Sequence, residues 1–151
     1  MKVAEALQLR ADLNRRIAQL GERLNANALV QEGESTPEDP KALLRELEES
    51  VKTLEELMYR INLSNAGTRQ DGKTVTEMIA HRDALRVKIE RYRSLISAAS
   101  QGAYRASRTE IKILPAVDVK ALQKQLDAMS REYRETDNAI QALNWSTELP
   151  E

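Results

Sequence analysis

Residue types that do acid–base, nucleophilic or metal chemistry are scarce in this chain of 151 residues. The absence of cysteine excludes a thiol nucleophile, a disulfide scaffold and cysteine-type zinc sites. The single histidine, His81, follows Glu77 by four residues, so one helical turn would bring the two together as metal ligands. Helical di-metal sites use Glu-x-x-His pairs on two helices, and a second histidine is missing here. We therefore expect no metal site, and Glu77 is better explained as a helix cap.

Nucleophilic catalysis also lacks its usual sequence patterns. No serine lies in a nucleophile elbow, and the chain has neither a Walker loop nor a dinucleotide-binding glycine pattern. The acidic pairs Glu48-Glu49 and Glu55-Glu56 fall within an expected helix, where a run of charge is typically a solvated face. We expect a protein that is not an enzyme and needs no cofactor. Its motifs identify no small-molecule substrate.

Charge is unevenly distributed along the chain, although its formal net charge is only −1. Residues 31–60 contain nine acidic and four basic residues, whereas residues 82–112 contain eight basic and three acidic ones. Arginines and tyrosines of the basic block would suit phosphate contacts and base stacking, but a nucleic-acid-binding domain normally has a basic excess overall. Nucleic acid is therefore not an expected partner. The opposite blocks favour contact between two halves of one chain or between subunits.

The elements that position these residues are expected to be helices. Aromatic residues make up 3% of the chain, and five glycines and four prolines are too few for a many-turned β-fold. Apolar residues recur at helical spacing in four segments, and we expect helices over residues 2–28, 40–64, 75–100 and 119–145. We predict an all-α fold in one domain, 1–151, arranged as an antiparallel four-helix bundle or as two long helical hairpins.

Each expected helix has an apolar stripe and a start signal. Asp39 before Pro40 and Asp118 fit N-caps, and Thr74 with Glu77 fits a capping box. The stripes are Val3, Ala6, Leu13, Ile17, Leu20 and Leu24; Leu44, Leu47, Val51, Leu54, Met58 and Ile61; Met78, Arg82, Leu85, Ile89, Tyr92, Ile96 and Ala99; and Leu122, Leu126, Met129, Tyr133, Thr136, Ile140 and Leu143. Arg82 is the odd member, since a guanidinium there needs a carboxylate partner or the edge of the core.

Neither end of the chain contains a targeting or spanning segment that we can identify. Glu5 and Arg10 come too early to leave room for the apolar core of a signal peptide. No run of residues approaches the ~18 apolar positions that cross a bilayer. We therefore expect a cytoplasmic protein without a membrane partner.

Short motifs along almost the whole chain follow the order and spacing of those in a group of small bacterial proteins. They include Ala4-Glu5-Ala6-Leu7, Arg10-Ala11-Asp12-Leu13, Gln31-Glu32-Gly33-Glu34, Arg60-Ile61-Asn62, Val117-Asp118-Val119 and Asn144-Trp145-Ser146-Thr147. In these motifs the chain resembles the septicolysin-like family. The resemblance implies no catalytic or cofactor residues. The family's name suggests a membrane-active cytolysin, whose amphipathic helices would insert after a rearrangement.

The resemblance also draws attention to polar residues in and beside the two later links between helices. The candidate anion or interface residues are Asn65, Thr68, Arg69, Arg82, Arg108 and Lys112. One hypothesis is a pocket at one end of the bundle, in which Arg69, Arg108 and Lys112 bind an anion. The alternative is that asparagine and threonine cap helix ends while the arginines bridge subunits.

The main functional hypothesis is a non-enzymatic helical protein that forms a homo-oligomer. Wide apolar stripes on four long helices can bury more area by joining a second subunit, and the opposite charge blocks would help to join them. A septicolysin-like cytolysin is the alternative hypothesis. A nucleic-acid-binding or anion-binding module is the third.

Overall fold

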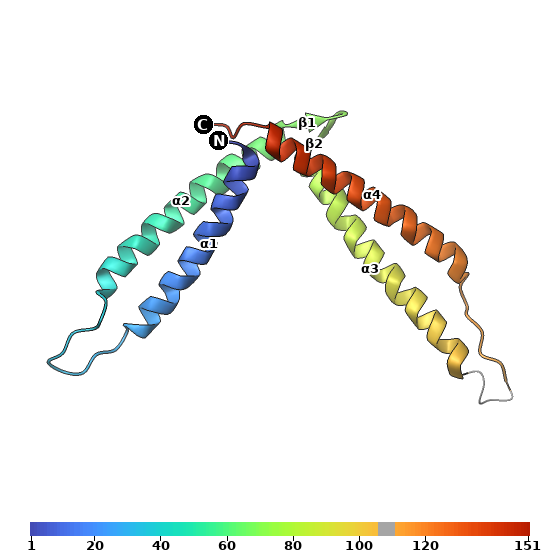
Figure 1. Ribbon diagram of the computed structural model, residues 1–151, viewed down its shortest axis with the longest axis horizontal. Coiled ribbons are helices and arrows are strands. Elements are labelled where there is room, and N and C mark those ends of the chain that lie inside the picture. The colour runs from blue at the N-terminus through green and yellow to red at the C-terminus, as the bar shows by residue number, and fades with distance from the viewer. Residues whose placement is uncertain (106–110) are drawn as a thin grey trace. The chain divides into compact units, whose positions relative to one another are not determined.

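The computed structural model describes residues 1–105 and 111–151. These residues form α1 (Val3–Ala26), α2 (Pro40–Gly67), α3 (Val75–Arg105) and α4 (Val119–Ser146), with short strands β1 (Arg69–Gln70) and β2 (Lys73–Thr74) before α3 (Figure 1). The prediction of an all-α fold is confirmed. The helix bounds agree with the expected ones except that α2 extends to Gly67 and α3 to Arg105.

The chain divides into two compact units. The first unit consists of Met1–Thr68 and Leu143–Glu151, and the second unit is Arg69–Ala142. In the first unit α1 lies alongside α2, and in the second unit α3 lies alongside α4 (Figure 1). The helices of each pair run antiparallel because one link joins their ends. A single four-helix bundle, a single domain and an oligomer all stay predictions.

The helix starts follow the predicted capping signals. The Asp39 carboxylate accepts from the N–H of Lys41 at 3.0 Å, with Pro40 in the first helical position. The Asp118 carboxylate accepts from the N–H of Ala121 at 3.0 Å. Both caps satisfy N–H groups that have no partner inside the helix.

The start of α3 is a reciprocal capping box, as predicted. The backbone N–H and the hydroxyl of Thr74 donate to Glu77 Oε2 at 2.6 and 2.9 Å, and the N–H of Glu77 donates to Thr74 Oγ1 at 3.1 Å. The hydrogen bonds to the Glu77 carboxylate lower its pKa. Just before this cap, β1 and β2 pair antiparallel around Asp71 and Gly72, whose φ values are 51° and 81°. Such positive values at both central residues make the tight turn that an Asp-Gly pair favours.

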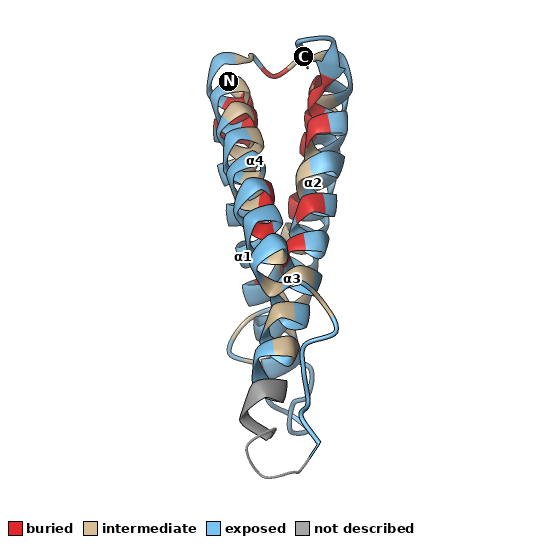
Figure 2. Ribbon diagram, turned by 90° about the vertical axis from the view of Figure 1, so that its right-hand side faces the viewer, coloured by how far each residue is buried: buried red, intermediate tan, exposed pale blue. Residues whose placement is uncertain are grey.

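The core of the first unit follows a seven-residue repeat. Buried positions recur along α1, α2, α3 and α4 between exposed ones (Figure 2). On α1 the buried side chains include Ala6, Leu13 and Leu20, so its predicted stripe is confirmed. Residues seven apart share one side of a helix, which is why this spacing holds one continuous contact with α2.

On α2 the predicted stripe is partly wrong. The buried positions that recur every seven residues are Leu43, Ser50, Leu57 and Ser64. Leu44, Val51 and Met58, which were expected to face inward, are 46, 45 and 41% exposed. The helix has apolar residues on two adjacent sides, and the buried side includes two serines as well as two leucines. Ser50 Oγ donates to the carbonyl of Glu46 at 2.7 Å, which satisfies its buried hydroxyl.

Both chain ends join the core of the first unit. The N–H of Val3 donates to the carbonyl of Thr147 at 3.0 Å, and the N–H of Leu149 donates to the carbonyl of Met1 at 2.8 Å. The Leu149 side chain is 6% exposed and packs in one cluster with Val3, Ala6 and Leu57. The segment after α4 is therefore part of the folded structure.

The second unit has its own core and a polar pair within it. Leu85, Ile89, Leu126 and Met129 are buried together, with Tyr92, Ile96 and Tyr133 packed against them. These residues are the predicted stripes of α3 and α4. Arg82 finds the carboxylate that its position requires, because Nη1 donates to Asp137 Oδ1 at 3.0 Å and Nε donates to Asp83 Oδ1 at 3.1 Å.

Candidate interaction surfaces

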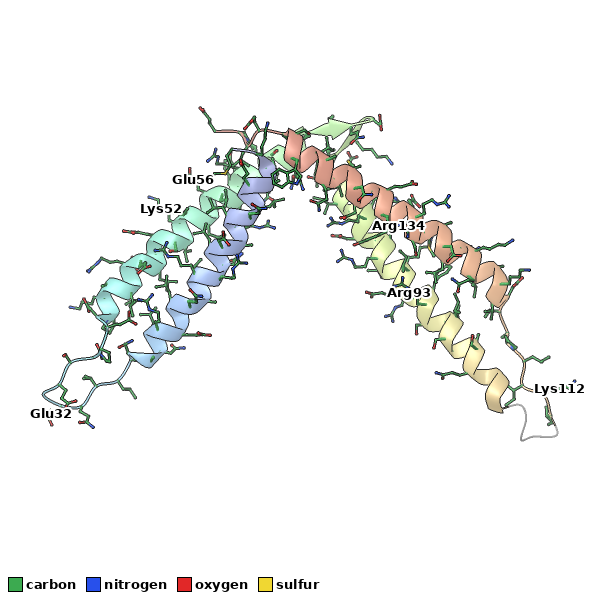
Figure 3. All side chains as sticks on the ribbon, viewed as in Figure 1. Glu32, Lys52, Glu56, Arg93, Lys112 and Arg134 are labelled. Carbon is green, nitrogen blue, oxygen red and sulfur yellow. The ribbon has the colours of Figure 1, made fainter. Side chains whose placement is uncertain are left out.

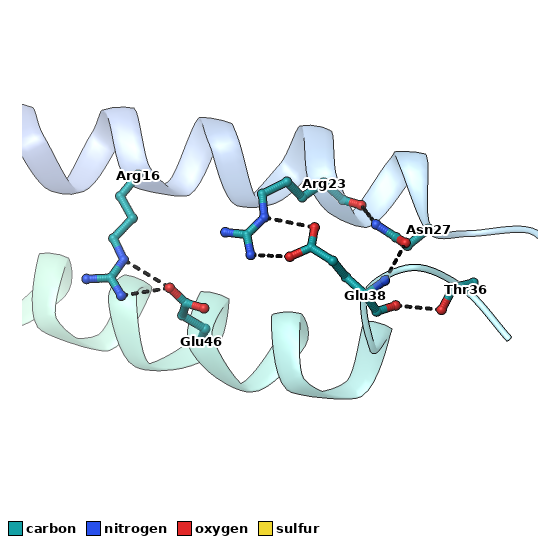
Figure 4. Close-up of polar contacts among 6 residues, drawn as sticks. All are labelled: Arg16, Arg23, Asn27, Thr36, Glu38 and Glu46. Carbon is teal, nitrogen blue, oxygen red and sulfur yellow. Dashed lines mark hydrogen bonds and ion pairs between the residues drawn. The ribbon is translucent and has the colours of Figure 1, made fainter.

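One face of the first unit has ion pairs that join α1 to α2 and to the link before α2 (Figure 4). Arg16 donates from Nη2 and Nε to Glu46 Oε1 at 2.7 and 3.2 Å. Arg23 donates from Nε to Glu38 Oε2 at 3.1 Å, and its Nη2 pairs with Oε1. The hydrogen bond from Arg23 lowers the pKa of Glu38. This face is already occupied by contacts within the chain.

Asn27 fastens the link between α1 and α2 to the same hairpin (Figure 4). Its side chain donates from Nδ2 to the carbonyl of Arg23 at 2.8 Å and accepts from the N–H of Glu38 at 3.0 Å. Thr36 Oγ1 donates to the carbonyl of Glu38 at 2.5 Å. Asn27 is 5% exposed, so these bonds are shielded from water.

The opposite face of the first unit is apolar and open. On both helices it is formed by residues that directly follow a buried residue of the seven-residue series. On α1 it also includes residues four positions after these. We call it the apolar face; it consists of Leu44, Val51 and Met58 on α2 and Ala11, Asn14, Ala18 and Gly21 on α1. These α1 members are small and uncharged, whereas Leu7 packs against the core. A Cβ added to Gly21 would meet nothing within 4 Å.

The second unit has a basic groove between α3 and α4. The groove has a volume of about 300 Å³ and is lined by Arg86, Ile89, Glu90, Arg93, Ser130, Tyr133 and Arg134. Arg86 lies 5.6 Å above the centre of the Tyr133 ring and donates from Nη2 to the Tyr133 hydroxyl at 2.8 Å. The bond to the hydroxyl raises the pKa of Arg86.

Arg93 and Arg134 reach this groove from different helices (Figure 3). Neither forms an ion pair with a carboxylate among the residues that the structure describes. Glu90 is the one acidic residue among the described residues that line the groove. The described residues that line the groove therefore carry three positive charges and one negative charge.

The chain's histidine lies at a second hollow of the second unit. His81 Nε2 lies 2.8 Å from Glu132 Oε1, at the edge of a pocket of about 320 Å³ that Asp71 and Glu135 also line. Within residues 1–105 and 111–151, no group of three or more histidine, aspartate or glutamate side chains is placed to hold a metal ion. Glu77 acts as a helix cap instead of pairing with His81.

Comparison with known proteins identifies relatives over almost the entire chain. Residues 10–149 match a family of unknown function, DUF6847. The chain belongs to this family. It is also similar to a solved structure described as a functionally unknown conserved protein from Corynebacterium diphtheriae, with 38% identity, a TM-score of 0.90 and 99% of each chain covered. No curated protein matches the chain.

These matches support the helical fold, and the structure adds one further finding. None of the described helices is both long enough and apolar enough to cross a membrane. Neither match bears on the resemblance to the septicolysin-like family, which stays a prediction.

Two of the predicted site residues lie at the end of α2. Asn65 is partly buried in its last turn, and Thr68 directly follows the helix. The N–H of Thr68 donates to the carbonyl of Ser64 at 2.8 Å. This contact fits the capping alternative.

The structure describes two of the three residues of the expected anion pocket, and they lie at opposite ends of α3. Arg69 lies in β1 before α3 and donates from Nη1 to the carbonyl of Gly72 at 3.0 Å, whereas Lys112 is exposed in the link that follows α3. The 31 residues of α3 separate them by about 45 Å. Arg108 lies outside the described residues. An interface role for these residues stays a prediction.

Sequence analysis missed the surfaces that the structure brings out. Arg93 was noted only as one member of a basic block, and Arg134 was not singled out. Their common groove follows from the seven-residue register of α3 and α4, because Arg86 and Arg93 directly follow the stripe residues Leu85 and Tyr92. Assigning that register on both helices would have predicted which basic residues line one groove.

Proposed function

We propose that this protein is a non-enzymatic assembly protein, whose first unit pairs with the first unit of a second copy through the apolar face. The observation that supports this proposal is the exposure of Leu44, Val51 and Met58 at a spacing of seven residues. Such spacing gives a continuous apolar stripe along one side of a helix, which is the pattern by which helices pack against each other. Scattered exposed apolar residues would not form such a stripe.

The occupant that fits this face best is a second copy, because the face is complementary to itself. Large side chains lie on α2, and small, uncharged ones lie on α1. A twofold axis parallel to the helices would place α2 of each copy against α1 of the other, with large side chains over small ones. The two hairpins would then form an antiparallel four-helix arrangement. Glu48 and Glu55, at the edge of the α2 stripe, would meet no acidic residue on the partner's α1.

The core of one copy shows which residues of α1 and α2 lie at the same position along the axis of the hairpin. Ala6 and Leu57 share one core cluster, and α1 and α2 run antiparallel. Counting from this pair along both helices places Leu44 level with Ala18 and Gly21. In the symmetric pair, Leu44 would therefore lie over the smallest residues of the partner's α1.

Sedimentation velocity over about 1 µM to 1 mM protein tests the proposal, since three half-exposed side chains per copy suggest modest affinity. We expect the wild-type chain to dimerise within this range and Val51→Glu to remain at the 17.1 kDa mass of one chain. Lys52→Gln is the matched control, because it makes the same change in net charge at the next residue of α2, about 100° around the helix from Val51 and outside the apolar face. Circular dichroism checks that all three chains are equally helical. A wild-type monomer throughout, or equal dimerisation of Val51→Glu, would contradict the proposal.

A further inference from the structure

The groove between α3 and α4 has the chemistry of a small anion-binding site. Arg86 and Arg93 approach it from α3 and Arg134 approaches it from α4. Guanidinium groups bind phosphate oxygens through pairs of parallel N–H bonds. We propose that this groove binds the phosphate group of a small phosphorylated organic molecule.

Arg86 is already held in place before a ligand arrives. Its guanidinium rests over the Tyr133 ring, 5.6 Å from the centre, and its bond to the Tyr133 hydroxyl is 2.8 Å long. One of its five N–H donors is used in this bond, so others stay available to an oxygen ligand. A side chain that is fixed in advance loses little conformational freedom when it binds.

Arg93 and Arg134 provide charge that is not neutralised by an ion pair within the described part of the chain. Together with Arg86 they bring three positive charges to the groove, and Glu90 brings one negative charge. The balance of two positive charges matches a phosphomonoester, which has a charge of about −1.5 to −2 at neutral pH. A single carboxylate group would neutralise only part of these two positive charges.

The rest of the lining favours an organic phosphate over the bare ion. Ile89 is 6% exposed and forms an apolar part of the wall, next to the Tyr133 ring. Ser130 adds a hydroxyl that can donate to a phosphate oxygen. A volume of about 300 Å³ is at the lower end of the range for small-molecule sites. A phosphate attached to one ring or a short chain fits these features.

Isothermal titration calorimetry with phenyl phosphate tests the proposal at low salt. The test variant is Arg93→Gln/Arg134→Gln, and the matched control is Arg91→Gln/Arg131→Gln, which removes two charges from the same helices outside the groove. We expect one phenyl phosphate per chain, binding that weakens about tenfold or more in the test variant and less than about twofold in the control. Binding should also weaken below about pH 6, where the phosphate gains a proton.

Inorganic phosphate and a single-stranded oligonucleotide are the comparison ligands. We expect inorganic phosphate to bind more weakly than phenyl phosphate, because it makes no contact with Ile89 or Tyr133. The proposal is overturned if phenyl phosphate does not bind at about millimolar concentration, or if both double variants weaken binding equally. It is also overturned if only the oligonucleotide binds, because the groove would then belong to a nucleic-acid surface. Thermal unfolding of each variant shows whether the fold is intact.

Discussion

Arg82 on α3 and Asp137 on α4 form an ion pair, 3.0 Å from Nη1 to Oδ1, within a contact that is otherwise largely apolar. The Arg82 side chain is only 19% exposed. Partial burial opposes its charge, but bonds to Asp83 and Asp137 outweigh that effect and raise the pKa of Arg82. The pair thus joins the two helices of the second unit at one defined level.

Removing one member of this pair should destabilise the protein. Arg82→Leu leaves Asp137 without its partner across the helices, and we expect the free energy of unfolding to fall by about 1–2 kcal/mol. Arg82→Leu/Asp137→Leu should recover most of this loss, because apolar residues can replace a partly buried pair. Urea denaturation measures the free energy of unfolding of both variants, and Arg91→Leu is the control at an exposed position. Equal stability of all three variants would show that the pair does not join the helices.

The capping box of α3 should make stability depend on pH. Hydrogen bonds from Thr74, first from its N–H and then from its hydroxyl, lower the pKa of Glu77 below its usual 4.5. A carboxyl with a lowered pKa stabilises the fold above the pKa of the unfolded chain, and this contribution is lost as the pH falls through the folded pKa. Glu77→Gln should therefore have a lower Tm than wild type at pH 7, and the difference should shrink by about pH 3.

The matched control for this measurement is Glu22→Gln, on an exposed part of α1. It should change Tm little at either pH, because no hydrogen bond to the Glu22 side chain is found among the described residues. If the Tm difference for Glu77→Gln is the same at both pH values, the ionised carboxylate does not stabilise the cap.

The link between α1 and α2 should depend on Asn27. Asn27→Ala removes the bonds to the carbonyl of Arg23 and to the N–H of Glu38, and it leaves both groups to find other partners. We expect a loss of about 1–3 kcal/mol in the free energy of unfolding, measured by urea denaturation. Asn25→Ala, at an exposed position of the same helix end, should cost much less. Similar losses for both variants would contradict the role given to Asn27.

The segment after α4 should matter more for stability than the tryptophan that precedes it. Leu149 is 6% exposed, whereas Trp145 is 55% exposed. Leu149→Ala should lower the free energy of unfolding by about 2–4 kcal/mol, because it leaves a cavity between Val3 and Leu57. Trp145→Ala should lower it by less, although a larger side chain is removed. The opposite order in thermal and urea unfolding would show that Leu149 is not a core residue.

Periodicity predicted most of the fold because the predicted stripes of α1, α3 and α4 contain residues that are buried in the two cores. Leu13 on α1 and Ile89 on α3 have polar or charged residues on both sides in the sequence, so their register is clear. On α2, Leu43 and Leu44 are adjacent, and hydrophobicity alone does not decide which one faces α1. In the structure Leu43 is buried, and its seven-residue series includes Ser50 and Ser64, whose polarity hides the series from a search for apolar stripes.

The prediction of an anion pocket did not take chain connectivity into account. Arg69 and Lys112 lie in links at the two ends of one long helix, so they cannot share one end of a hairpin. The basic groove could not be found from sequence spacing within one helix, since it combines Arg93 with Arg134 across two helices. Predicting a contact between two helices requires the register of both helices.

Cysteine cross-linking tests the symmetric pairing of the apolar faces most directly, because the chain has no cysteine of its own. Chains with Ala18→Cys and chains with Leu44→Cys are mixed, oxidised and separated by mass under denaturing conditions. The account predicts a disulfide-linked mixed dimer, formed faster than when Lys52→Cys replaces Leu44→Cys. Equal or slower cross-linking of the Ala18→Cys and Leu44→Cys mixture would contradict it, because α2 of one copy would then not lie against α1 of the other.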